Sequence, residues 1–211
     1  EIVGIRGSGV GSLREYQIGY QSVSLTEEGQ IDYEAVAQAI KPTTKMIGIQ
    51  RSKGYDTRPS FTVDQIKEMI QFVKTIKPDV VVFVDDCYGE FVERMEPTDV
   101  GADLMAGSLI KNPGGGLAKT GGYIAGRADL VERCAFRLTS PGIGAEAGAS
   151  LYSLLEMYQG FFLAPHVVGQ SLKGALFTAA MLERWGFNPT PSWQEPRTDV
   201  VQAVQSHDRD K

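Results

Sequence analysis

The stretch that decides the fold is VVVFVDD, residues 80–86. A run of β-branched and aromatic residues precedes two aspartates, and no polar residue interrupts it. A short, continuous apolar run is typical of a strand buried on both faces of a parallel sheet. Open α/β sheets bind ligands beyond the carboxyl ends of their strands. Asp85 and Asp86 therefore lie where such a sheet would carry a functional site.

Segments of two kinds flank this strand. Strand-like patterns lie at 20–25, 45–50, 103–109 and 121–126. Helical spacing of apolar residues lies at 31–40, 63–75 and 128–138, and at 146–185 as two long helices interrupted near Gly160 and Pro165. The alternation predicts a three-layer α/β/α fold with a mostly parallel sheet.

Local signals fix the start of two of these helices. Asp32 is the expected N-cap of the first, and Thr62 with Gln65 forms a T-x-x-Q capping box before the second. Three prolines follow Gly186 and precede a strand-like TDVVQAV, so we expect a soft domain boundary there. Because the chain begins EIVGIRG without a methionine, we also expect a fragment of a longer protein.

Bulk composition excludes several classes. The chain has 211 residues, 42% of them hydrophobic and 22% charged, which is ordinary for a soluble globular protein. Its 21 basic and 26 acidic residues give a net charge of −5 without a dense basic cluster, which argues against nucleic acid and anionic membranes as partners. Cys87 and Cys134 lack CxxC spacing, so we expect reduced thiols, no metal site and a cytoplasmic location.

Two glycine clusters resemble nucleotide sites and fail in detail. Residues 7–11, GSGVG, lack the following helix of several turns that a dinucleotide fingerprint needs. The stretch GGGLAKTGG would need glycines at positions 113 and 118 to be a P-loop, and these are Pro113 and Ala118. Neither cluster predicts a phosphate cradle.

A third constellation joins Asp85, Ser108 and Lys111. Lys111 follows Asp85 by 26 residues at the end of the next strand-like segment, so both side chains are expected at the same edge of the sheet. A plain ion pair and two solvated charges are equally consistent with this spacing. Spacing alone does not choose among them.

Several stretches resemble known proteins. VFVDDCYGEFVE, GADLMAGSLIKNPGGG and TGGYIAG are similar to the large domain of fold-type I pyridoxal-phosphate enzymes. EIVGIRGSGVGSLREY, RPSFTVDQI, APHVVGQSLKGA and EPRTDVVQA resemble, more closely, the methionine gamma-lyase-like proteins often called aluminium resistance proteins. The likeness covers essentially the whole chain. It implies that residues 1–186 are the central part of a cofactor-binding large domain and that 187–211 begin a small domain.

The resemblance also implies roles for individual residues. Lys111 would form the internal aldimine with pyridoxal 5′-phosphate, and Asp85 would pair with the pyridinium nitrogen of the cofactor. Ser108 would contact the cofactor phosphate. The chain departs from the wider lyase pattern at Ile110, where a threonine is usual, and at Asp86, where many relatives have asparagine.

Further residues are weaker candidates. Gln50 or Ser52 would lie near the 3′-oxygen of the cofactor, and Arg197 would bind the substrate carboxylate through its guanidinium group. Candidates of lower rank are Tyr55, Arg58, Tyr88 and His166.

The resemblance predicts a carbon–sulfur lyase that depends on pyridoxal phosphate and acts on a small sulfur-containing amino acid, as a homodimer or homotetramer. Another reaction of the same cofactor remains an alternative, namely transamination or an aldol-type cleavage. A truncated, non-catalytic domain of the same fold is the third hypothesis.

Overall fold

The computed structural model describes residues 3, 10–56, 58–146, 148 and 150–205, and the chain forms two compact units, 1–42 and 43–211. Most of the GSGVG cluster at 7–11 lies outside the described residues. The first unit contains the 3-10 helix η1 (Leu13–Tyr16) and the helix α1 (Tyr33–Ala39). The Asp32 carboxylate accepts a hydrogen bond from the Ala35 backbone N–H at 2.9 Å, which confirms the predicted N-cap.

The strand predicted at 20–25 is wrong. These residues have no regular secondary structure, although Val23 and Leu25 are half-buried as an alternating pattern requires. A strand exists only through hydrogen bonds to a neighbouring strand, and no described residue supplies that partner here. The alternating pattern at 20–25 therefore predicted correctly which side chains are half-buried, but it did not predict whether the segment pairs with another strand.

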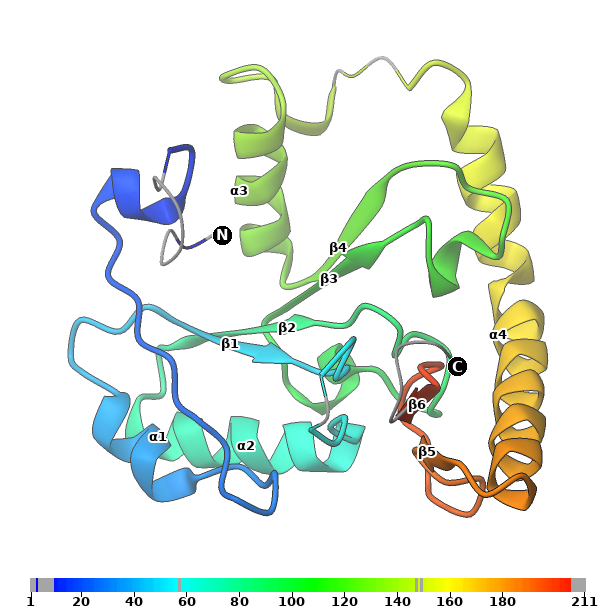
Figure 1. The fold of residues 1–211 in the computed structure, drawn as a ribbon. Helices are drawn as coiled ribbons and strands as arrows, with labels where there is room; N and C mark the ends of the chain where they lie inside the picture. The colour runs from blue at the N-terminus through cyan, green and yellow to red at the C-terminus, as the bar shows by residue number, and fades with distance from the viewer. Residues whose placement is uncertain (1–2, 4–9, 57, 147, 149, 206–211) are drawn as a thin grey trace. The chain divides into compact units, whose positions relative to one another are not determined.

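The second unit is built on one four-stranded sheet (Figure 1). Its strands, in spatial order, are β1 (Met46–Gln50), β2 (Val81–Asp85), β3 (Leu104–Ser108) and β4 (Gly122–Gly126). The first three are parallel, and β4 is antiparallel to β3. This confirms the α/β class with a mostly parallel sheet. The register places Gln50 beside Asp85 and Asp85 beside Ala106, so three strands end at one edge.

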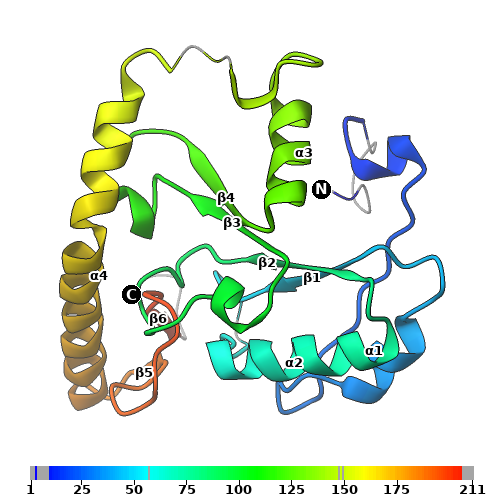
Figure 2. The same ribbon diagram turned by 180° about the vertical axis from the view of Figure 1, so that it is seen from behind.

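Helix α2 (Val63–Ile76) covers one face of the sheet in both ribbon views (Figures 1 and 2). Its predicted capping box is present, with the Thr62 and Gln65 side chains each bonded to the backbone of the other. Ile66 and Val73 of the helix, like Val82 and Val84 of β2, are completely buried. Burial of such side chains stabilises the fold by about 1.5–3 kcal/mol each.

The opposite face of β2 is less covered than the sequence predicts. Val81, Phe83 and Asp85 are only half-buried, so burial alternates along the strand. The predicted strand is confirmed, but its predicted burial on both faces is not. No described element covers its second face completely.

A single long helix replaces the two predicted at 146–185. α4 spans Ser153–Arg184 and includes Pro165, and α3 (Ala128–Leu138) matches its prediction. Gly160 does not break the helix. Its Cα lies against the backbone of Gly114, where any side chain would collide with a carbonyl oxygen. The glycine therefore permits close packing of α4 on the loop after β3.

The remaining elements are short. They are the 3-10 helices η2 (Pro97–Val100), η3 (Asn112–Gly114) and η4 (Gly144–Glu146), and the antiparallel strands β5 (Asn188–Thr190) and β6 (Ala203–Gln205). Between β5 and β6 the chain returns to the edge of the main sheet, where the Val200 N–H donates to the Tyr88 carbonyl at 3.1 Å. The boundary near Gly186 stays a prediction. Within the described residues, no helix combines the length and the apolar character that crossing a membrane requires.

Candidate active site

Lys111 lies three residues beyond the end of β3, at the N-cap position of η3. Its side chain is half-buried, and its Nζ atom is 4.1 Å from the centroid of the Tyr88 ring. Tyr88 follows β2 in a left-handed conformation, with φ of 74°. An ammonium group over an aromatic face is held by the negative potential of the ring. Tyr88, ranked low from sequence, therefore contacts the predicted cofactor lysine.

Asp85 and Lys111 meet around the Cys87 thiol. The Asp85 carboxylate accepts a hydrogen bond from the Cys87 N–H at 3.2 Å. Burial raises the pKa of the Cys87 thiol, with Asp85 adding to the rise and a hydrogen bond to Lys111 opposing it. Burial lowers the pKa of Lys111, but the interactions with Cys87, Tyr88 and Asp85 outweigh it, so the net direction is upward. The amine and the carboxylate thus act on one another without direct contact.

Neither charge has an ion-pair partner among the described residues. The plain Asp85–Lys111 ion pair that the spacing allowed is therefore not formed. Sequence reasoning overlooked Cys87 as part of the site. Its position two residues after Asp85, in the same short motif, was the available signal.

Ser108 and Ile110 lie on the same short connection. Ser108 is half-buried at the end of β3, and its carbonyl accepts a hydrogen bond from the Lys111 N–H at 3.2 Å. Ile110 is 61% exposed, so the departure from the lyase pattern falls on a side chain that faces solvent. The contact of Ser108 with a phosphate stays a prediction.

Gln50 and Ser52 differ in their availability. Gln50 is exposed at the end of β1, beside Asp85 in the sheet register. The Ser52 hydroxyl is buried and donates to Asp199 at 2.6 Å, so it already serves the C-terminal segment. Of the two candidates, the structure leaves Gln50 free to meet a ligand.

Arg197 belongs to the same C-terminal segment. Its guanidinium donates to the Val201 carbonyl at 3.4 Å and to the Gln202 side-chain oxygen, and its Nε atom is buried without a partner. Burial lowers the pKa of Arg197, while Asp199 and Glu195 oppose the change. These contacts lie within the C-terminal segment, so the role of Arg197 as a carboxylate clamp stays a prediction.

The remaining low-ranked candidates, Arg58, Tyr55 and His166, differ in their contacts and exposure. The Arg58 guanidinium donates to the backbone carbonyls of Gln50 and Ser52 at 2.9 and 2.7 Å, so it shapes the loop after β1. Tyr55 and His166 are exposed. Arg58 therefore supports the edge of the sheet, and the other two make no visible contribution to the site.

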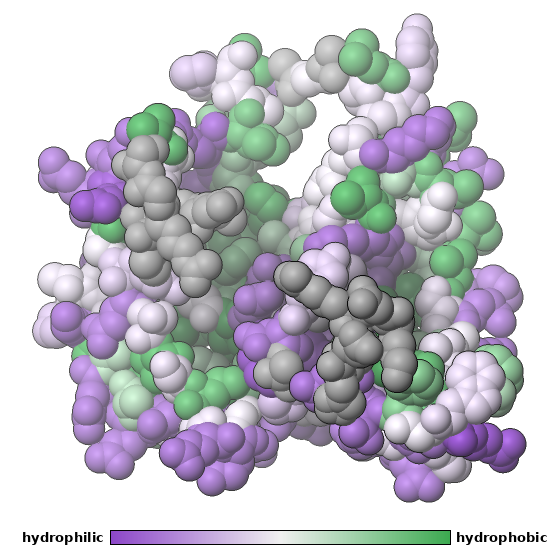
Figure 3. All heavy atoms as spheres, in the orientation of Figure 1, coloured by the Kyte–Doolittle hydropathy of each residue, from purple (hydrophilic) through white to green (hydrophobic). Residues whose placement is uncertain are grey.

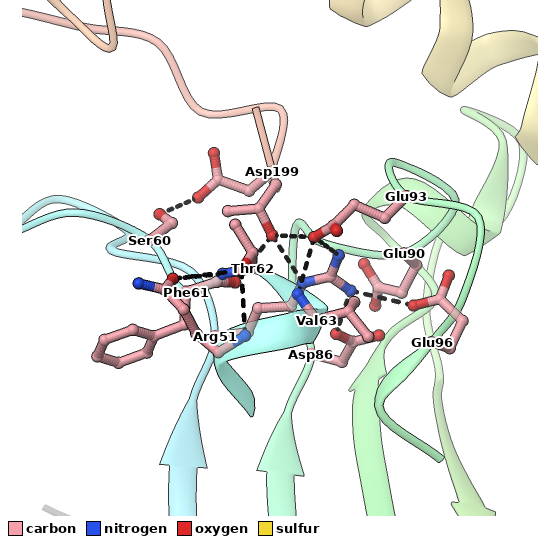
Figure 4. Close-up of polar contacts among 12 residues, drawn as sticks. Arg51, Ser60, Phe61, Thr62, Val63, Asp86, Glu90, Glu93, Glu96 and Asp199 are labelled. Carbon is pink, nitrogen blue, oxygen red and sulfur yellow. Dashed lines mark hydrogen bonds and ion pairs between the residues drawn. The ribbon is translucent and has the colours of Figure 1, made fainter. Parts of the chain in front are cut away.

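A buried ionic cluster, missed from sequence, lies around Arg51, beyond the carboxyl end of β1 (Figure 4). The fully buried Arg51 donates to Asp86 at 2.8 Å, to Glu96 at 3.0 Å and to Glu93 at 3.1 Å. Glu90 lies close enough to interact electrostatically with Arg51. We call Asp86, Glu90, Glu93 and Glu96 the acid cluster. Asp86 is thus part of a structural network and not a second carboxylate beside Asp85.

The acid cluster has more carboxyl groups than its single guanidinium can neutralise. Burial raises the pKa of Asp86, against the opposing charge of Arg51. Burial also raises the pKa of Glu90 to about 7, although a backbone hydrogen bond and one from Tyr123 oppose it, and raises that of Glu96 to about 7. Some members of the cluster therefore carry a proton in the folded chain near neutral pH.

This protonation makes stability depend on pH. Glu90 has an ordinary pKa of 4.5 and a folded value of about 7, so between these values the folded state holds a proton that the unfolded state has released. The free energy of unfolding therefore falls as pH rises through this window, by at most about 1.4 kcal/mol per pH unit for one group. In Glu90→Gln we expect a smaller fall, measured by urea unfolding at pH 5, 6 and 7. The exposed Glu132→Gln is the control, and equal slopes in both variants would contradict the assignment.

Comparison with known proteins decides the family. The methionine gamma-lyase family model matches residues 1–211. The chain belongs to this family. It is 68% identical over 212 residues to the uncharacterized protein YnbB of Bacillus subtilis, covering 100% of the chain and 50% of that protein.

Solved structures of this family agree with the fold. A candidate cystathionine beta-lyase involved in aluminium resistance, from Listeria monocytogenes, superposes with a TM-score of 0.97 at 66% identity, covering 99% of this chain and 52% of that one. A carbon–sulfur lyase involved in aluminium resistance, from Clostridium novyi, gives a TM-score of 0.94 at 44% identity, covering 99% of this chain and 50% of that one. This member of the methionine gamma-lyase family thus spans about half the length of these relatives.

Proposed function

We propose that the chain supplies the cofactor lysine and its supporting residues to a carbon–sulfur lyase that depends on pyridoxal phosphate. The observation that carries the proposal is that Lys111 and Asp85 both interact with Cys87, so that an amine and a carboxylate lie at one sheet edge without forming an ion pair. A primary amine and a carboxylate are the two groups that this cofactor needs, one for its aldehyde and one for its ring nitrogen. The residues present therefore fit the cofactor.

In this proposal each residue has a defined task. Pyridoxal phosphate, when bound, supplies an electron sink that stabilises negative charge at the α-carbon of an amino acid. Lys111 holds the cofactor and moves a proton at its Nζ atom, and Asp85 holds a proton on the ring nitrogen. Tyr88 orients the lysine through its ring. Exposed Gln50 lies beside Asp85 on the neighbouring strand and is the proposed polar group near the cofactor.

The substrate follows from the names of the relatives. They point to a sulfur-containing amino acid with a carbon–sulfur bond, of the cystathionine type. Cleavage of that bond, with addition of water, releases a thiol, a 2-keto acid and ammonia. Arg197 is the proposed partner of the substrate carboxylate, because a guanidinium binds a carboxylate through two parallel hydrogen bonds.

Product analysis tests the proposal. The purified chain is incubated with pyridoxal phosphate and L-cystathionine, L-methionine or L-cysteine, and thiol and keto acid are measured. We expect equal amounts of both, and their loss in Lys111→Ala but not in Lys119→Ala, whose side chain is exposed beside the same glycine loop. Keto acid without thiol would favour an aminotransferase, and no product with any substrate would favour a non-catalytic domain.

We propose further that the chain associates as a homodimer or homotetramer through α4. Hydrophobic side chains lie exposed along this helix, on the right of the view in Figure 3. Large ones include Leu155, Tyr158, Phe162 and Phe177, with exposed fractions of 69–83%. Exposed apolar patches of this kind mark contact surfaces in soluble proteins.

A further inference from the structure

The backbone carbonyl of Tyr88 joins three segments of the chain. It accepts one hydrogen bond from the Asn112 side-chain amide at 3.0 Å and another from the Val200 N–H at 3.1 Å. The Asn112 amide also donates to the Glu90 carbonyl at 3.0 Å. One side chain, adjacent to Lys111 in sequence, thus ties the loop after β3 to the turn after β2 at two points.

The turn that Asn112 holds is unusual in its backbone. Tyr88 and Phe91 both have positive φ, 74° and 63°, and neither is glycine. Such conformations cost about 1–3 kcal/mol each and persist only where the surroundings hold them in place. The two hydrogen bonds from Asn112 fall on carbonyls inside this strained segment. They therefore help to fix the conformation that directs the Tyr88 ring at Lys111.

Two other contacts of this region hold different atoms. Arg51 binds the side chains of Asp86, Glu93 and Glu96, so it anchors the carboxylates and not the carbonyls. Gly114 fixes the far end of the loop through its close contact with α4. The Asn112 amide bonds the backbone carbonyls of the Tyr88 turn, whereas the Lys111 amine interacts with the side chains of Cys87 and Tyr88.

We propose that Asn112 is a positioning residue for the active site: its amide sets the Lys111 amine against Tyr88, Cys87 and Asp85. Through the shared Tyr88 carbonyl it also sets Lys111 relative to residues 197–200, which carry Arg197. This inference rests on the proposed function for its catalytic meaning. Its physical content, the placement of the Lys111 amine, is independent of any cofactor.

The test measures the titration of Lys111 in the chain without cofactor. Trace acetylation with acetic anhydride, followed by mass spectrometry of the Lys111 peptide across a pH series, gives the pKa and the reactivity of this amine. Because Cys87, Tyr88 and Asp85 raise the pKa of Lys111, loosening the loop lowers it toward the ordinary lysine value. We expect this downward shift in Asn112→Ala and Asn112→Leu, the second of which keeps nearly the same volume without a donor.

Asn188→Ala is the matched control, since Asn188 is the other asparagine of the chain and is exposed in β5. It should titrate as the parent chain does. If Asn112→Ala does not fold, as judged by circular dichroism, Asn112→Ser provides the comparison with a smaller shift in the same direction. A folded Asn112 variant with an unchanged Lys111 titration, even with a lower melting temperature, would overturn the proposal.

A second readout separates this inference from the proposed function. Attachment of pyridoxal phosphate to Lys111, trapped with borohydride, is expected to be roughly tenfold slower in Asn112→Ala, because small misplacements of a reacting group slow reactions strongly. If the parent chain does not bind the cofactor, the proposed function fails while the acetylation result stands. If the parent binds it and Asn112→Ala binds at the same rate, positioning by Asn112 is refuted.

Discussion

Arg51→Met is expected to lower the free energy of unfolding by about 3–5 kcal/mol, or to prevent folding at neutral pH. Arg51 is completely buried and is the guanidinium that Asp86, Glu93 and Glu96 share. Methionine fills much of the same volume but leaves Asp86 buried, and Glu93 and Glu96 half-buried, without a counter-charge. The loss should appear in urea unfolding monitored by circular dichroism.

The pH dependence of this loss identifies its cause. Because burial gives Glu90 and Glu96 pKa values of about 7, protonation at pH 5 removes much of the uncompensated charge. The difference between Arg51→Met and the parent chain should therefore be smaller at pH 5 than at pH 8. Arg133→Met, on the exposed side of α3, is the control and should change stability by less than about 0.5 kcal/mol. A loss as small for Arg51, or one independent of pH, would contradict the ionic account of the cluster.

Gly160→Ala is expected to destabilise the chain by about 1–3 kcal/mol. In an open helix the same change is stabilising by about 0.5–1 kcal/mol, since glycine is the poorer helix former. At Gly160 the added methyl group would meet the backbone of Gly114, which cannot move without displacing the loop that carries Lys111.

Gly174→Ala provides the matched comparison within the same helix. Apart from the adjoining backbone of α4 itself, no atom lies within 4 Å of a methyl group added at Gly174, so this variant should be stabilised. The two changes are chemically identical and should have opposite signs in urea unfolding. Stabilisation of both variants would show that α4 does not pack on the loop as described.

Local signals in the sequence were sufficient to predict the central strand of the sheet and the N-terminal caps of helices α1 and α2. The run at 80–86, the Asp32 cap and the box of Thr62 and Gln65 each depend on residues within a few positions of one another. Residues 20–25 failed because a strand needs a distant partner. Gly160 failed as a helix breaker because its packing against Gly114 outweighs its intrinsic preference, and Pro165 is also accommodated inside α4.

The site could be predicted in outline for a related reason. Parallel strands end at a common edge, so Asp85 and Lys111 could be brought together from their positions after successive strands. The contacts that define their environment are long-range. Arg51 meets Asp86 across 35 residues and Thr198 across 147, and Asn112 meets Tyr88 across 24. No periodicity or short motif encodes such pairs.

The proposed function depends on Lys111 being the lysine that holds pyridoxal phosphate. Its most direct measurement is incubation of the chain with the cofactor, reduction with borohydride and mass spectrometry of the resulting peptides. We expect one predominant modified peptide, containing Lys111, whose label disappears in Lys111→Ala and persists in Lys119→Ala. Labelling spread over exposed lysines, with no preference for Lys111, would contradict it.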